Sequence, residues 1–110
     1  MPTTYKILGQ SNPTANTLTT VYTVPATNSA VISTITVANL SGTENTRYKL
    51  AVVRSGQNIA NNNYIAFNTT VLSHDSIALT LGLTLAANDS IRANVETSNI
   101  AINVFGSEIY

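Results

Sequence analysis

The chain has 110 residues, 44% of them hydrophobic and only 9% charged, and its formal net charge is zero. This length predicts a single domain, residues 1–110, with one core. The charge balance offers no basic surface for nucleic acid or an anionic membrane. Cysteine is absent, which excludes disulfides, thiolate metal sites and a cysteine nucleophile.

Short stretches of alternating apolar and polar residues, separated by turn residues, follow one another along the whole chain. They predict strands at residues 5–8, 18–24, 30–40, 46–54, 64–71, 76–85, 90–97 and 100–109. One helical turn at residues 58–60 is the only helical signal. Regularly spaced strands of this kind predict an all-β protein, a single antiparallel β-sandwich of about eight strands that resembles a jelly roll.

The longest alternation runs from residue 76 to residue 85. One face carries five aliphatic side chains, and the other is small and flat, with Ala78, Thr80, Gly82 and Thr84. The aliphatic face is predicted to occupy the middle of the two-sheet core, where Leu81→Ala would cost on the order of 2–5 kcal/mol. The small face provides no chemistry, so it is interpreted as a contact surface, exposed or docked against a neighbouring subunit.

Three other strands carry specific expectations. Uninterrupted alternation in 30–40 places Val31, Ser33, Ile35 and Val37 on one face and Ile32 on the other. In 64–71 the residues predicted to point inward are Ile65, Phe67, Thr69 and Val71. Within 100–109, Gly106 is the expected bulge or kink.

Residues able to perform catalysis are few and scattered. His74, Asp75 and Ser76 are the residue types of a hydrolytic triad, but triad groups converge from separate segments, so a turn is the favoured interpretation. Asp75 and Asp89 lie in turns at opposite ends of one strand, roughly 30 Å apart, too far for a glycosidase pair. One histidine cannot build a histidine-based metal site. The chain is therefore expected not to be an enzyme and to need no cofactor.

Two surface groups remain as binding candidates. The cations Arg47, Lys49, Arg54 and Arg92 are interpreted as a solvated sheet face or as salt-bridge partners, for instance of Glu96. Tyr64, beside the run of asparagines that includes Asn62, is the one candidate aromatic platform for a sugar.

The segments PTTYKILGQ (2–10), LTTVYTVP (18–25) and VFGSEI (104–109) resemble small virion structural proteins of tailed bacteriophages, especially those of cyanobacteria. YIAF (64–67) and LTLGLTLAAND (79–89) fit the same family. The resemblance covers nearly the whole chain, although each segment by itself is an ordinary threonine-rich strand or turn.

This resemblance implies a virion location and a β-sandwich present in many copies, with no catalytic residues to carry over. The leading hypothesis is a capsid decoration (cement) protein that contacts the major capsid protein or other virion proteins and forms a homo-oligomer. The alternative is a tail, baseplate or fibre component. A third hypothesis is a glycan-binding adhesion module that acts through the loop from Asn61 to Tyr64, which includes Asn62.

Overall fold

The computed structural model describes residues 3–110, apart from the side chain of Leu81. Its strands are β1 (Thr3–Ser11), β2 (Thr19–Thr23), β3 (Ser29–Asn39), β4 (Thr46–Val53), β5 (Tyr64–Val71), β6 (Ser76–Leu85), β7 (Ser90–Val95) and β8 (Ile100–Ile109). Every predicted strand is present, and β5, β6 and β8 have the predicted ends. The helical turn expected at residues 58–60 lies instead at η1 (Asn61–Asn63).

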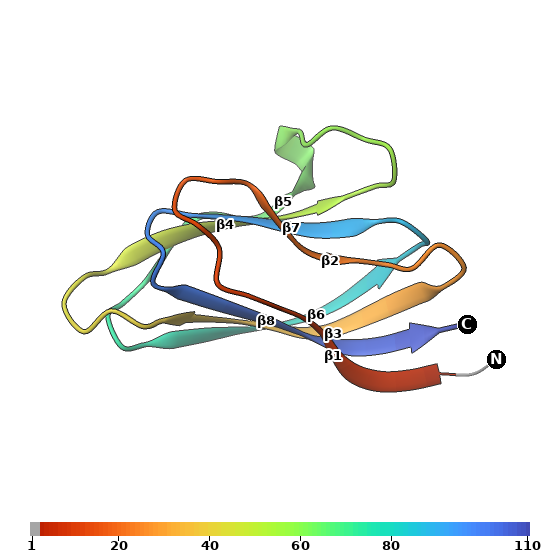
Figure 1. Cartoon of the computed structure of the whole chain (residues 1–110), viewed down its shortest axis with the longest axis horizontal. Helices are drawn as coiled ribbons and strands as arrows, with labels where there is room; N and C mark the ends of the chain where they lie inside the picture. Colours follow the sequence, from red (N-terminus) through yellow and green to blue (C-terminus); the bar gives the residue numbers. More distant parts are fainter. Residues whose placement is uncertain (1–2) are drawn as a thin grey trace.

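The strands form two antiparallel sheets of four strands each, packed face to face (Figure 1). Sheet A has the order β1-β8-β3-β6, and sheet B has the order β2-β7-β4-β5. The pairing is nested: β1 pairs with β8, β2 with β7, β3 with β6 and β4 with β5. A chain folded back as one long hairpin and then wound into two sheets has the jelly-roll topology. The predicted all-β sandwich is therefore confirmed, including its jelly-roll character.

The core lies between the two sheets and receives side chains from both. In β7 and β8 the alternating residues are buried as the period of two predicts. The fully buried side chains include Ile91, Val95, Ile100, Ile102 and Val104 from these strands, and Tyr48 and Leu50 from β4. Burial of a large aliphatic side chain contributes roughly 1.5–3 kcal/mol, so this layer is the main source of stability.

An irregularity at Ser33 interrupts the alternation predicted for β3. The register with both neighbouring strands shifts between Ile32 and Thr34. An extra residue in a strand moves the side chains that follow to the opposite face. Ile32 therefore lies in the core together with Ile35 and Val37, and the prediction that placed Ile32 on the opposite face is wrong.

A second irregularity lies in β5 and has a larger consequence. Asn68 adopts a left-handed backbone conformation with φ of 52°, and here the register of β5 against β4 shifts. Asparagine tolerates this conformation better than most residues. Thr69 and Val71 keep the predicted inward orientation, but Ile65 and Phe67 are exposed, contrary to the prediction. Ala66 packs against the core in their place.

The strand β6 has the predicted two faces but not the predicted position. Ile77, Leu79 and Leu83 pack against the core, yet they are only half-buried because β6 is an edge strand of sheet A. Leu85 is buried in the core, but the prediction that placed the aliphatic face as a whole in the middle of the core is wrong. The prediction for Leu81 lies outside the described side chains.

Candidate functional site

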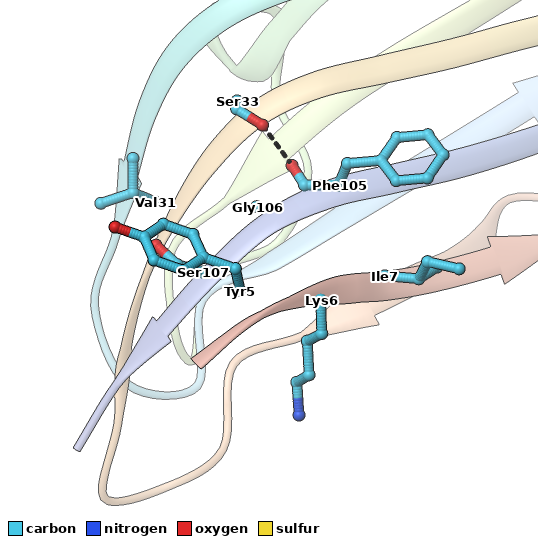
Figure 2. Close-up of a pocket in the computed structure, with 8 residues that line it drawn as sticks. All are labelled: Tyr5, Lys6, Ile7, Val31, Ser33, Phe105, Gly106 and Ser107. Atoms are coloured by element: carbon cyan, nitrogen blue, oxygen red, sulfur yellow. Dashed lines mark hydrogen bonds between the residues drawn. The ribbon is translucent and has the colours of Figure 1, made fainter. Parts of the chain in front are cut away.

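The outer face of sheet A carries an apolar hollow near the two chain ends. Its volume is about 520 Å³, and Figure 2 shows the residues that line it, on β1, β3 and β8. The apolar members are Tyr5, Ile7, Val31 and Phe105. Tyr5 is 83% exposed and Ile7 is 53% exposed. Large apolar side chains gathered at this exposure mark interaction surfaces more often than isolated ones do.

Strand register arranges these residues in two rows across the sheet. Tyr5 lies beside Ser107, which lies beside Val31 of β3, and the tyrosine ring extends toward Val31 in Figure 2. Ser107 is buried even though it faces outward, because the small serine lies between larger neighbours. The second row joins Ile7, Phe105 and Thr34.

Gly106 lines the hollow and permits the close approach of two strands. A Cβ atom on Gly106 would lie 2.1 Å from the backbone oxygen of Val31. The bulges are in the strands on either side, at Leu8 of β1 and at Ser33 of β3. Gly106 was expected to be the bulge itself; it is the residue of β8 that lies against the bulged segment.

The predicted contact residues of β6 belong to the same face as the hollow. Ala78, Thr80, Gly82 and Thr84 are all exposed. Thr84 pairs with Val31 and Thr80 pairs with Thr34, so the two rows continue from β1 across the whole sheet to β6. The outer face of sheet A is thus apolar at the β1 side and small and neutral at the β6 side.

A buried carboxylate lies beneath the hollow and ties three strands together. Glu108 of β8 is 5% exposed. Its Oε1 lies 2.8 Å from Nζ of Lys6 on β1, and the hydroxyl of Tyr22 on β2 donates to its Oε2 at 2.7 Å. These two donors hold the pKa of Glu108 below its ordinary value, while burial and the adjacent carboxylate raise the pKa of Tyr22. The group is satisfied and joins sheet A to sheet B.

The second predicted contact group, Tyr64 with Asn62, lies at and just before the start of β5 in sheet B. The structure therefore does not bring it together with β6, which belongs to sheet A. Tyr64 lines a hollow of about 370 Å³ together with Asn61 and Phe67. The rings of Tyr64 and Phe67 meet edge to face at 5.0 Å, and Nζ of Lys49 lies 4.8 Å from the centre of the Phe67 ring. Asn62 is exposed and does not line this hollow. The sequence pattern placed Phe67 in the core and therefore missed it as a surface residue. Asn68, which follows it, was the available indication of an irregularity, because asparagine tolerates the left-handed backbone conformation.

The residues considered for catalysis lie in or beside turns, where the two aspartates accept hydrogen bonds from the backbone. His74 lies in the turn before β6 with φ of 55°, and the side chain of Asp75 accepts from the backbone N–H of Ser76. Asp89 likewise accepts from the backbone of Ala86 and Ser55. Asp75 and Asp89 flank opposite ends of β6, as predicted. Within residues 3–110, no cluster of three or more potential metal ligands is found.

The cations behave largely as surface groups. Arg47 forms an exposed salt bridge with Glu96 at 2.7 Å, one of the partners suggested by the sequence. This contact raises the pKa of Arg47 and lowers that of Glu96, although exposed pairs contribute little to stability. Over the described part of the chain, the structure has no helix of the length and hydropathy that crossing a membrane requires.

Comparison with known proteins gives a match among solved structures. No protein-family model matches the chain, and no curated protein matches it. Among solved structures, the chain is similar to the crystal structure of a pentameric capsid protein isolated from metagenomic phage sequences, with a TM-score of 0.36 and 16% identity. The match covers 96% of this chain and 60% of that protein, so this chain spans about three fifths of its length. A likeness at this level carries no argument about function.

Proposed function

We propose that this chain is a structural protein of a bacteriophage virion, specifically a capsid decoration protein that acts through contact and not as an enzyme. The observation that carries the proposal is the outer face of sheet A. That face combines the apolar hollow at Tyr5 and Ile7 with the neutral surface of β6. The proposed partner is the major capsid protein or another virion protein.

The energetics of this face suit a contact repeated many times on one particle. Covering Tyr5 and Ile7 would remove on the order of 250 Å² of apolar surface, which corresponds to about 6 kcal/mol before the costs of association. A single contact of this size is weak once those costs are subtracted. Many copies, each held weakly but together bridging neighbouring subunits, reinforce the particle through multivalency.

The sequence supports the same proposal independently. The segments that resemble phage virion proteins include residues 2–10 and 104–109. In the structure these two segments pair as β1 and β8 and contribute Tyr5, Ile7 and Phe105 to the hollow. The resemblance includes these strands but covers nearly the whole chain, so it supports the virion role and does not by itself select this face.

The proposal is tested with particles that lack the protein. We expect such particles to lose resistance to heat or osmotic shock, and we expect added wild-type protein to restore it. Ile7→Ser should fail to restore it, whereas Phe67→Ser, which changes a residue of similar exposure on sheet B, should succeed. Unchanged resistance of the particles without the protein would contradict the cement role.

A second candidate is a tail, baseplate or fibre component that binds glycans. The observation that favours it is the hollow on sheet B, where Phe67 is 56% exposed beside Tyr64 and Asn61. An exposed aromatic ring with the amide group of Asn61 at its side is a suitable platform for a sugar. Binding of the wild type on a glycan array, lost in Tyr64→Ala, would support this candidate; no binding by the wild type would end it.

A further inference from the structure

The outer edge of β6 is long and carries no charged residue and no proline. Natural proteins protect an edge strand with charges, prolines, bulges or short length, because unpaired backbone groups accept a further strand. In residues 3–110, β6 hydrogen-bonds to one strand, β3, and its other side is open. Its one irregularity lies near Gly82, which leaves the first half of the strand regular.

The other edge strands of the two sheets are better protected. β1 carries Lys6 and a bulge at residue 8. β2 has only five residues. β5 is interrupted by the left-handed Asn68. β6 is therefore the edge on which a further strand fits with least hindrance.

The hydrogen-bond phase of β6 identifies which backbone groups face outward. The backbone N–H of Asn39 donates to the carbonyl oxygen of Asp75 at 2.9 Å, which makes Ala38 and Ser76 a non-hydrogen-bonded pair of the β3–β6 ladder. Such pairs alternate along an antiparallel ladder, and their N–H and C=O groups point away from the partner strand. Ala78 and Thr80 thus direct their backbone groups toward the open edge.

We propose that β6 pairs with β6 of a second copy of this chain, antiparallel, about a twofold axis at Leu79. In this register Ala78 of each copy exchanges hydrogen bonds with Thr80 of the other. A twofold axis requires a surface that complements itself. The Ala78–Thr80 pairing meets this requirement, because it occurs once on each side of the axis. The two A sheets then form one continuous sheet, with both apolar hollows on the same side.

Three properties favour a second copy as the occupant. The chain has zero net charge and the strand has no charged residue, so two copies do not repel each other. The half-buried Ile77 and Leu79 at the edge would gain cover from the added strand. The small side chains of Ala78 and Thr80 let the second strand continue the sheet without obstruction. The inference goes beyond the proposed virion role and does not rest on it.

Disulfide trapping tests the register in the full chain, which has no cysteine of its own. Leu79 would lie opposite Leu79 of the second copy as a non-hydrogen-bonded pair. The two Cα atoms would be about 4.5 Å apart, which is within disulfide range. Leu79→Cys should therefore give a disulfide-linked dimer under mild oxidation. Leu83→Cys is the matched control on the same half-buried face; its two copies would lie about 27 Å apart and should not link.

Sedimentation equilibrium supplies a second test that needs no cross-link. Wild type should dimerise, and Thr80→Pro should weaken dimerisation at least about tenfold by removing one outward donor per copy. A proline whose missing N–H would face outward is tolerated in an edge strand, so we expect the variant to fold, and thermal unfolding is the check. The pairing is overturned by a wild type that stays monomeric at about 1 mM, by dimers unaffected by Thr80→Pro, or by equal linking of both cysteine variants. If the chain stays monomeric and β6 binds a strand of another protein, that strand, and not a second copy, is the occupant of the edge.

Discussion

Replacing Gly106 with alanine places a methyl group where two central strands of sheet A approach each other. The new Cβ would lie 2.1 Å from the backbone oxygen of Val31 and 3.1 Å from Cα of Ile32. Both are backbone atoms of β3, so relief requires β3 and β8 to separate. Separation would disturb the ladder that joins these strands and the hollow on the outer face.

The expected cost follows from two opposing contributions. Overpacking that shifts the backbone destabilises the fold by about 3 kcal/mol. Replacing glycine also restricts the unfolded chain, which offsets about 0.5–1 kcal/mol of this loss. The net destabilisation is about 2 kcal/mol, or a fall in Tm of roughly 10 °C for a domain of this size. Gly82→Ala is the matched control in the same sheet, because its Cβ would meet no atom within 4 Å.

The assay is urea unfolding of wild type, Gly106→Ala and Gly82→Ala, at a concentration low enough for the chain to be monomeric. Gly82→Ala should be unchanged or more stable by up to about 1 kcal/mol. The account of the close approach is refuted if Gly106→Ala unfolds within about 0.5 kcal/mol of the wild type with the same m-value.

Two further predictions concern the core and its buried carboxylate. The pKa of Glu108 is lowered in the folded state by Lys6 and Tyr22, so its stabilising contribution is present above pH 4.5 and is lost as the pH falls through the folded-state pKa. Glu108→Gln should accordingly lower the urea midpoint at pH 7 and reduce its fall between pH 6 and pH 3; an unaltered pH dependence would contradict the assigned role. Leu85→Ala, at a buried position, should cost about 2–5 kcal/mol, against about 0.5 kcal/mol or less for Leu72→Ala at an exposed one. Similar costs for the two leucine variants would show that the burial is misassigned.

Period-two patterning was sufficient to predict the fold because each strand of a jelly roll has one face in the core. Where a strand is regular, as in β7 and β8, alternate apolar residues are buried, as a period of two predicts. Where a bulge intervenes, the alternation reverses across it, so one uninterrupted pattern is right on only one side of the bulge, as at Ser33 and Asn68. A bulge depends on how a strand meets its neighbours, so alternation within one strand does not reveal it.

The candidate site was predicted only in part for a related reason. The small face of β6 is visible in one stretch of sequence, and its four residues are exposed as expected. Tyr5, Ile7 and Phe105 come from opposite ends of the chain and meet only because β1 pairs with β8. The contact of Lys6 and Tyr22 with Glu108 likewise depends on strand order, which no local pattern specifies.

An electron-microscopy map of the phage particle tests the central claim most directly. We predict a jelly roll on the capsid surface, in a copy number close to that of the major capsid protein. We expect the outer face of sheet A, with Tyr5 and Ile7, to lie against the capsid. A few tens of copies or fewer, a position on the tail, or a contact made through sheet B alone would contradict the proposed decoration role.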